Sequence, residues 1–449
     1  MGKYFGTDGI RGVAGAVLDA ELAFKVGRAA AMVIEKKDEA QLKVLIAKDT
    51  RISCDMLEAA LSAGLCSAGA NVNLLGVLPT PAAAYLTIKT QADMGIVISA
   101  SHNSYEHNGI KIFGGNGYKL SDALEEKIEH LVDHVEGIPE FVNGKFGCIS
   151  QDHGFWTKEY VNYVASAAVG GRFKGRIAID CANGAATETA RLIFRQIGAE
   201  FEIGFDEPNG ININEACGST HLGYLEDMMK TGRFSLGIAF DGDADRCLIV
   251  DELGNTIDGD MMLCVLSKNM QEAGTLKGDG FVGTVVSNAG MEVFAKDNGM
   301  KFYRADVGDR NVLERMLELG CNLGGESSGH VIFSDEATTG DGQLTAVKFL
   351  NALTKSGKKA SELVADIPRF PQVMPSFKLT GGAQQRDAIM AHPKLQTELL
   401  KYEKILDGNG RVFIRPSGTE PIIRVLVEAK TEQQATEIAD HFLNVMGML

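Results

Sequence analysis

Residues 44–78 read VLIAKDTRISCDMLEAALSAGLCSAGANVNLLGVL. The apolar run at 44–47 predicts a buried strand, and the polar residues 48–51 predict the turn that follows it. A helix is expected over 56–68, and a second apolar strand over 72–78. This order of strand, turn, helix and strand is typical of a parallel α/β layer.

The same unit returns twice further along the chain. Each copy has a short apolar strand, a polar turn, a helical stretch and a second strand; the second copy covers 177–204 and the third covers 281–304. In the third copy the first strand is expected over 281–286. A solenoid would repeat at a shorter period, so this spacing predicts three related α/β domains.

The end of the chain has a different pattern. Strand-like runs at 411–415 and 422–428 flank a tight turn at 416–421, and a helix is expected over 432–445. This pattern predicts a small α+β domain.

Three stretches are typical of linkers, at 147–154, 251–259 and 368–375, and the last holds three prolines. The expected fold class is therefore α/β, with three related α/β domains and a C-terminal α+β domain. The predicted boundaries are 1–150, 151–252, 253–368 and 369–449.

Composition and net charge exclude some classes of binding partner. The 449 residues include 44 Lys and Arg against 59 Asp and Glu, a formal charge of −15, and 45% are hydrophobic, as in soluble globular proteins. The acidic excess argues against nucleic acid or an anionic membrane as a partner. A small anionic substrate needs only a local cluster of donors, so it is still allowed.

Eight scattered cysteines without a CxxC pair fit neither a zinc site nor a disulfide framework. The first residues have no apolar signal core, and no apolar stretch reaches the roughly 18 residues that a membrane span needs. We therefore expect a cytoplasmic protein in a reducing compartment.

Residues 99–103, SASHN, follow an apolar run at 94–98. Small residues ahead of Ser101 leave its hydroxyl accessible, and the Asn-Gly pair at 108–109 predicts a turn further on. No GxSxG elbow surrounds Ser101, so a hydrolase triad has no support. Adjacent residues in an extended loop point apart, so His102 need not be its base. A polar connection between strands is the alternative.

Residues 241–246 read DGDADR and lie between two strand-like runs. Asp241, Asp243 and Asp245 alternate with small residues, which lets the chain curl and direct three carboxylates at one hard cation. Without a cation, three neighbouring carboxylates repel one another. No His or Cys ligand set is offered, so Mg²⁺ is favoured over zinc.

Three alternatives for this acidic loop can be compared with the sequence. A solvated turn is one. An EF-hand is excluded by Arg246, which stands where that loop needs glycine, and by the flanking strands. An aspartyl-phosphate phosphatase also follows a strand with Asp-x-Asp, so a nucleophilic Asp241 stays open.

Three further segments carry groups suited to a phosphorylated sugar. Residues 324–330, GGESSGH, offer Glu and Ser to sugar hydroxyls, and residues 415–421, RPSGTEP, offer Arg, hydroxyls and a glycine turn to a phosphate. The opening 6–12, GTDGIRG, offers Arg11 as a phosphoryl clamp. A glycine-rich hairpin, a polar hairpin tip and an N-terminal turn are the respective alternatives.

In this order the five segments resemble the α-D-phosphohexomutase superfamily, over the whole chain. Residues 212–214, 217–221 and 308–310 also look like its bacterial branch that acts on glucosamine phosphates. The resemblance implies a heart-shaped protein in which one loop from each of four domains meets in a central cleft. It also implies a small-molecule hexosamine phosphate as partner, and a monomer or homodimer.

The resemblance further implies what each residue does. Ser101 carries a phosphoryl group, and this phosphate with Asp241, Asp243 and Asp245 binds one Mg²⁺; a sugar bisphosphate is the activator. The implied reaction interconverts glucosamine 6-phosphate and glucosamine 1-phosphate for cell-wall precursor synthesis. Substrate contacts are implied for Glu326, Ser328, Arg415, Ser417, Gly418, Thr419 and Arg246. A general base and acid are also required, with Lys111 and His102 as candidates, supported by Arg11 and His330.

Three positions depart from the family pattern. Ser104 stands where Pro is usual, Ser327 where the glucosamine branch has Gln, and Asn311 where Tyr is expected. Ser327 keeps a phosphomannomutase or phosphoglucomutase as the alternative. A non-catalytic phosphosugar binder is a remoter one, because a binder needs no nucleophile at Ser101.

Overall fold

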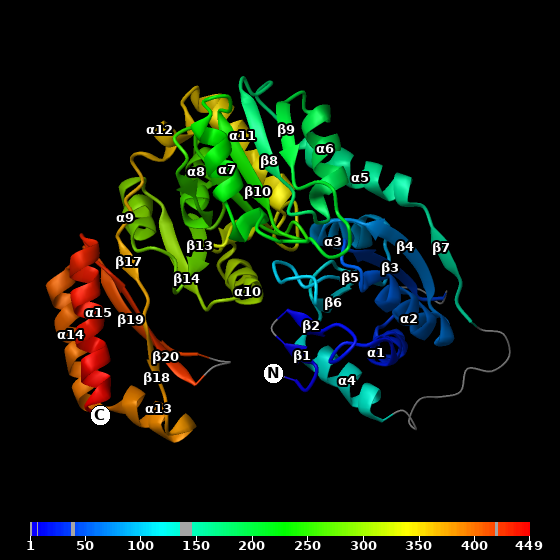
Figure 1. The fold of residues 1–449 in the computed structure, drawn as a ribbon, viewed down its shortest axis with the longest axis horizontal. Helices are drawn as coiled ribbons and strands as arrows, with labels where there is room; N and C mark the ends of the chain where they lie inside the picture. The colour runs from blue at the N-terminus through cyan, green and yellow to red at the C-terminus, as the bar shows by residue number, and fades with distance from the viewer. Residues whose placement is uncertain (1, 7, 37–40, 135–145, 418–420) are drawn as a thin grey trace.

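The computed structural model describes the chain except for residues 1, 7, 37–40, 135–145 and 418–420. The described residues form four sheets in chain order, each with its own helices (Figure 1). Among these residues, no helix has the length and apolar character required to cross a bilayer.

The first sheet has seven strands in the order β1-β2-β6-β5-β3-β4-β7. They are β1 (Phe5–Gly6), β2 (Gly9–Val13), β3 (Lys43–Lys48), β4 (Asn71–Val77), β5 (Met94–Ile98), β6 (His107–Gly114) and β7 (Ile149–Gln151). The helices before β7 are α1 (Ala20–Val33), α2 (Cys54–Ser67), α3 (Thr80–Lys89) and α4 (Asp122–Asp133). β3 pairs in parallel with β4 and β5, as the first repeat predicts.

Alternation along β3 explains why this sheet is covered on both faces. Val44 and Ile46 pack with α1, α2 and α4, whereas Leu45 and Ala47 pack with α3 and α5 (His153–Ser166). Successive strand residues point to opposite faces, so a continuous apolar run produces a sheet that is buried on both sides.

The second sheet has the order β12-β11-β10-β8-β9. Its strands are β8 (Arg176–Asp180), β9 (Glu200–Gly204), β10 (Leu236–Phe240), β11 (Cys247–Val250) and β12 (Thr256–Ile257). The helical segments here are α6 (Ala186–Gln196), the 3-10 turn η2 (Gly218–Thr220) and α7 (Gly223–Lys230). β12 pairs with β11, so this sheet takes in part of the stretch expected to be a linker at 251–259.

The third sheet has the order β14-β13-β15-β16. Its strands are β13 (Gly280–Thr284), β14 (Lys301–Ala305), β15 (Leu323–Gly325) and β16 (Val331–Phe333). Its helices are α8 (Gly259–Glu272), α9 (Gly290–Asp297), α10 (Asp309–Leu319), α11 (Gly342–Ser356) and α12 (Ala360–Val364). β13 ends two residues before the predicted strand, because Thr284 N–H donates to Ser287 Oγ at 3.0 Å and the chain turns.

The last sheet is antiparallel, with β20 at its centre. Its strands are β17 (Gln372–Val373), β18 (Ser376–Lys378), β19 (Arg411–Pro416) and β20 (Ile422–Glu428). Its helices are α13 (Gly382–Ala391), α14 (Pro393–Leu406) and α15 (Glu432–Gly447). This agrees with the expected α+β unit at the end of the chain.

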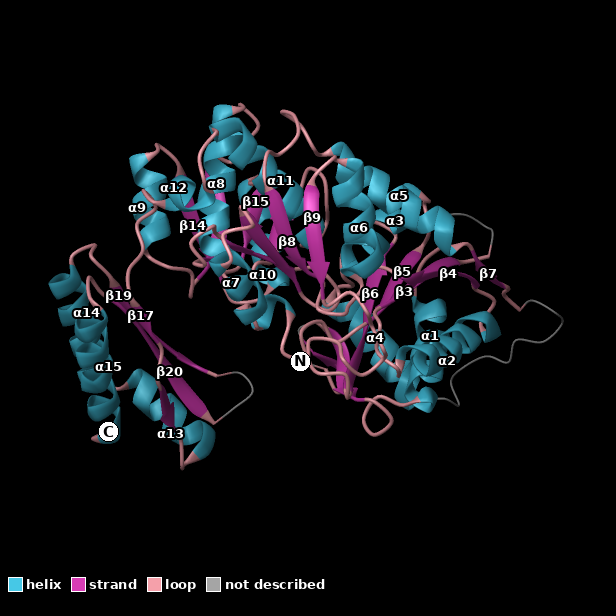
Figure 2. Cartoon of the chain, turned by 45° about the horizontal axis from the view of Figure 1, so that its top comes forward, coloured by secondary structure: helices cyan, strands magenta, loops and turns pink. Residues whose placement is uncertain are grey.

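Each sheet with its helices is called a unit. The apolar cores show how tightly the four units are joined. One core is shared by the second and third sheets and includes α8 and α11, and another joins the first sheet to α5. The last unit has a core of its own, built from residues 389–446, and Figure 2 shows it set to one side of the other three. The first three units therefore form one packed body with the fourth attached at its edge.

Candidate active site

Ser101 lies in the turn between β5 and β6, where the first unit meets the second. Its backbone has φ +53°, and its side chain is buried at 1% exposure. The Ser101 N–H donates to Ser99 Oγ at 2.9 Å, and the Ser101 hydroxyl donates to Asp241 Oδ2 at 2.6 Å. The turn thus aims the predicted nucleophile at the predicted metal loop.

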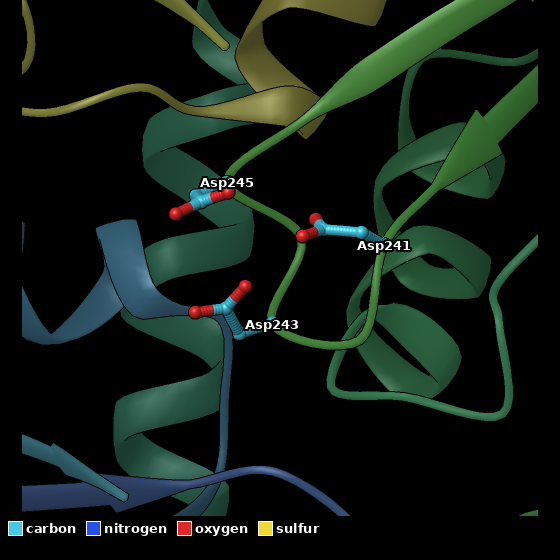
Figure 3. A group of neighbouring side chains, drawn as sticks. All are labelled: Asp241, Asp243 and Asp245. Carbon is cyan, nitrogen blue, oxygen red and sulfur yellow. The ribbon is translucent and has the colours of Figure 1, made fainter. Parts of the chain in front are cut away.

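Asp241, Asp243 and Asp245 lie in the turn between β10 and β11 and point toward one another (Figure 3). Ala244 adopts φ +55°, which lets the chain curl between them. One carboxylate oxygen from each lies within 4.8 Å of the others, and all three residues are buried. The structure therefore gathers the three carboxylates as the sequence predicted.

This acidic cluster fits a divalent cation. The pKa of Asp241 is raised to about 8, mainly because the group is buried and further because Asp245 and Asp243 repel its negative charge. Among the described residues, no donor hydrogen-bonds Oδ1 of Asp243 or Oδ1 of Asp245, although both atoms are buried. Unsatisfied buried carboxylate oxygens are costly, and a hard cation with oxygen preference would satisfy them.

Lys111, on β6, is enclosed by three carboxylates. Its Nζ lies 2.8 Å from Asp243 Oδ2, 3.1 Å from Asp8 Oδ2 and 3.5 Å from Asp245 Oδ2. Burial alone would lower the pKa of Lys111, but Asp243, Asp8 and Asp245 outweigh it and hold the pKa well above its ordinary value. Lys111 is therefore protonated in this arrangement, so it does not serve as a base there.

His102 follows Ser101 and lies beside two arginines. Its Nδ1 is 3.4 Å from Ser101 Oγ. Burial, then the charges of Arg246 and Arg11, lower the pKa of His102 to about 4. The ring is therefore neutral near pH 7 and able to accept a proton. Arg11 itself is paired with Asp8.

His330 joins the second and third units next to the acidic cluster. Its backbone pairs with Arg246 in an isolated antiparallel bridge. Its Nδ1 lies 3.6 Å from Asp245 Oδ1, and its Nε2 accepts the Gly340 N–H at 3.0 Å. Burial lowers the pKa of His330, but Asp245 and the other acids around it outweigh burial and raise the pKa. Because Nε2 accepts the Gly340 N–H, it has no room for a second ring proton, and this hydrogen bond favours the neutral ring.

A hollow of about 450 Å³ opens between the first three units. It collects six residues that the sequence singled out: Arg11, Ser101, Asp245, Arg246, Glu326 and His330. Tyr4, Gly6, Asp8, Gly9, Val307, Gly308 and Asp309 complete the lining. Within it, Glu326 Oε1 accepts the Gly308 N–H at 3.0 Å. Ser328 Oγ is buried and has no hydrogen-bond partner among the described residues.

The predicted phosphate loop lies on the fourth unit, outside the lining of this hollow. Arg415 is at the end of β19, and Ser417 follows the strand, whereas Gly418 and Thr419 lie outside the described residues. Burial and the neighbouring Arg424 lower the pKa of Arg415. The structure thus gathers the predicted residues of three units and leaves those of the fourth apart.

Two residues, one at the hollow and one beside Arg415, were not predicted from the sequence. Lys119 Nζ lies 2.5 Å from Asp309 Oδ2 and also pairs with Asp8, which links the first unit to the third. Arg424 lies opposite Arg415 in the register of β19 and β20. Pairing the predicted strands at 411–415 and 422–428 antiparallel would have placed Arg424 beside Arg415. No sequence pattern around Lys119 indicates its link to the third unit.

Comparison with known proteins covers every unit of the chain. The four models of the phosphoglucomutase/phosphomannomutase family match in order: α/β/α domain I at 2–137, domain II at 158–254, domain III at 258–370 and the C-terminal domain at 377–445. Phosphoglucosamine mutase of Caldicellulosiruptor saccharolyticus is 47% identical over 448 residues, 99% of either chain. Phosphoglucosamine mutase of Clostridioides difficile is 45% identical over 99% of either chain.

Solved structures give the same fold. A phosphoglucomutase/phosphomannomutase family protein from Burkholderia thailandensis superposes with TM-score 0.82 at 25% identity, over 100% of this chain and 98% of that one. N-acetylphosphoglucosamine mutase of Aspergillus fumigatus, solved with GlcNAc-6P and magnesium, has TM-score 0.70 at 18% identity over 98% and 95% of the two chains. These matches confirm the resemblance found in the sequence. The chain belongs to the phosphoglucosamine mutases, an isomerase family within the α-D-phosphohexomutase superfamily.

Proposed function

We propose that this enzyme interconverts glucosamine 6-phosphate and glucosamine 1-phosphate by way of a phosphoryl group on Ser101 and a sugar bisphosphate intermediate. The observation that carries the proposal is the 2.6 Å hydrogen bond from the Ser101 hydroxyl to Asp241, at a hollow lined by three units. A binding protein needs no nucleophile, whereas here a buried serine hydroxyl donates to a carboxylate of the acidic cluster.

A phosphoryl group on Ser101 requires a countercharge. Phosphoserine carries about −1.5 to −2 at neutral pH and would stand beside Asp241, Asp243 and Asp245. Those three carboxylates, with the phosphate, would hold Mg²⁺, which supplies positive charge when it is bound. Lys111 adds a fixed ammonium 2.8 Å from Asp243 and limits the remaining repulsion.

Proton transfer falls to two groups beside the nucleophile. We assign the base role to neutral His102, which lies 3.4 Å from Ser101 Oγ, and the acid role to Lys111, which carries a proton. Arg11 and Arg246, which line the hollow with His330, are placed to attract the transferring phosphate. Each transfer moves the phosphoryl group between a sugar oxygen and Ser101 Oγ, and the second transfer restores phosphoserine.

The sugar and its second phosphate would contact the third and fourth units. Glu326 and Ser328 would hold sugar hydroxyls, and the loop around Arg415, with Ser417, Gly418 and Thr419, would grip the phosphate that does not react. The bisphosphate must turn end for end between these two sites, so both of its phosphates are presented to Ser101 in sequence. We propose domain limits of 1–150, 151–252, 253–368 and 369–449, with β12 of the second sheet reaching past the second limit.

The amino sugar is favoured over glucose and mannose because the relatives at 45–47% identity are phosphoglucosamine mutases. The test compares kcat/KM for the 6-phosphates of glucosamine, glucose and mannose, with catalytic glucose 1,6-bisphosphate and Mg²⁺ present. We expect the highest kcat/KM with glucosamine 6-phosphate. A higher value with either hexose would assign the enzyme to the phosphoglucomutase or phosphomannomutase activity. Release of free phosphate instead of isomer would point to a phosphatase that uses Asp241.

A further inference from the structure

Helix α3 of the first unit begins against the acidic loop of the second. Its first residue, Thr80, is 1% exposed and follows Pro79, whose side chain cannot cap the helix. The Thr80 N–H donates to the Asp243 carbonyl oxygen at 2.9 Å, and the Thr80 hydroxyl donates to Asp243 Oδ2 at 2.6 Å. One residue thus holds both the backbone and the side chain of Asp243.

The two oxygens of Asp243 have unequal surroundings. Oδ2 accepts from Thr80 and from Lys111 at 2.8 Å, while buried Oδ1 has no hydrogen-bond partner among the described residues. Rotation of the carboxylate would break both bonds on Oδ2. The pair of donors therefore fixes which oxygen Asp243 presents to the acidic cluster.

Thr80 and Lys111 contribute differently to this orientation. Lys111 also contacts Asp8 and Asp245, so its charge is spread over three carboxylates. The Thr80 hydroxyl is a short, neutral donor with few rotamers, fixed at the start of a helix whose first turn is buried. Donors of this kind behind a metal ligand orient it and raise metal affinity.

We propose that Thr80 is a positioning residue for the cation site, holding Asp243 so that Oδ1 is free to bind the metal. The inference rests on the proposed function, because it presupposes that Asp241, Asp243 and Asp245 bind a divalent cation. It adds that the first unit contributes to that site through α3 as well as through the Ser101 turn.

The test measures Mg²⁺ and Mn²⁺ affinity of the full chain by calorimetry, without substrate. Thr80→Val removes the hydroxyl at nearly constant volume, and we expect binding weaker by about 10- to 100-fold. Thr80→Ser keeps the donor and should bind close to the wild type. Thr87→Val is the matched control, because Thr87 is buried in the same helix and donates to Ala83 O at 2.7 Å.

The outcomes separate this inference from the proposed function. If Thr80→Val binds metal as tightly as the wild type, or if Thr87→Val loses as much affinity, the role of Thr80 is overturned while the metal site stands. If the wild type binds no more Mg²⁺ than Asp241→Asn, the metal site itself fails. Should Thr80→Val not fold, Thr80→Cys makes the same comparison with a poor donor.

Discussion

The Arg51 guanidinium donates to Asp49 Oδ2 at 2.9 Å, and neither side chain reaches solvent. Arg51 Nη2 donates to two carbonyl oxygens in the turn that holds Ser101, at 3.0 Å to that of Ser101 and 2.9 Å to that of Asn103. Asp49 accepts the Ser99 hydroxyl at 2.6 Å, and Ser99 accepts the Ser101 N–H. The buried pair thus supports the left-handed backbone that aims Ser101 at Asp241.

Replacing Arg51 tests whether this support matters for turnover. Arg51→Lys keeps the charge but has too few donors to bind the turn carbonyls, so Ser101 Oγ shifts from its place. We expect kcat to fall by about 10²-fold with little change in KM, because a misplacement of about 1 Å has that cost. Steady-state kinetics measure both constants, and circular dichroism checks folding.

Arg172→Lys is the control for this substitution, because Arg172 pairs with Glu200 on the surface. It should leave kcat and KM unchanged. A rise in KM at constant kcat in Arg51→Lys would instead mean that the turn shapes substrate binding, contrary to the role assigned to the Asp49–Arg51 pair.

Tyr160 on α5, which falls within the second domain at 151–252, and Asp341, the N-cap of α11, test how the second and third units are held together. The Tyr160 hydroxyl lies 3.0 Å from each Asp341 carboxylate oxygen, and both residues are buried. Burial raises the pKa of Asp341 to about 6. Hydrogen bonds from the Leu344 N–H and the Tyr160 hydroxyl favour the carboxylate and limit this rise. Tyr163, Cys247 and Glu336 are the other titratable groups nearby.

Tyr160→Phe should therefore destabilise the protein in a pH-dependent way. Below pH 6 the Asp341 carboxyl is protonated in both proteins, and the difference in unfolding free energy is small. Above pH 6 the wild-type carboxylate is ionised and accepts the Tyr160 hydroxyl, so the deficit of the variant grows to about 1.5–3 kcal/mol by pH 8. Urea unfolding at pH 5 and pH 8 measures it.

Tyr163→Phe, on the same helix, removes a hydroxyl that donates to the Glu336 carbonyl oxygen at 2.8 Å. Because a backbone carbonyl does not titrate, the loss of unfolding free energy in Tyr163→Phe should be independent of pH. Equal deficits for Tyr160→Phe at both pH values would show that Asp341 does not ionise in the folded protein over this range.

Arg411 on β19 attaches the fourth unit to the third. Its guanidinium binds the carbonyl oxygens of Val285 at 2.7 Å and Ser287 at 2.6 Å, and its Nε donates to buried Glu428 at 2.7 Å. Arg411→Ala leaves Glu428 buried without its countercharge, which costs about 3–5 kcal/mol. We expect faster hydrogen exchange in β19 and β20 and a separate, earlier unfolding transition.

Arg386→Ala is the control in the same unit, because Arg386 makes an exposed pair with Asp387. An exposed ion pair adds little to stability, so this variant should unfold like the wild type. If Arg411→Ala also unfolds in one unchanged transition, the attachment does not depend on this guanidinium.

The sequence predicted the elements whose signal is local. The run at 94–98 became the fully buried β5, and the alternating acids at 241–246 became one cluster, because both patterns involve neighbours along the chain. The predicted strand at 281–286 was two residues too long at its end, because the Ser287 hydroxyl bonds the Thr284 N–H and begins the turn earlier.

Contacts between distant segments were not predictable in this way. Thr80 and Asp243 are 163 positions apart, and nothing around Thr80 indicates that the start of α3 meets the acidic loop. The partners of Lys111 likewise depend on how the first two units pack, since Asp243 and Asp245 come from the second. Residue types indicated the chemistry of the site, and packing decides which side chains support it.

Peptide mass spectrometry can show whether Ser101 carries the phosphoryl group. After incubation of the full chain with glucose 1,6-bisphosphate and Mg²⁺, we predict one phosphoryl group per chain, on the peptide that contains Ser101. Ser101→Ala should then take up none and lose mutase turnover. Phosphate on another residue, such as a hydroxylamine-sensitive phosphate on Asp241, or near-normal turnover of Ser101→Ala, would show that Ser101 is not the phosphoryl carrier.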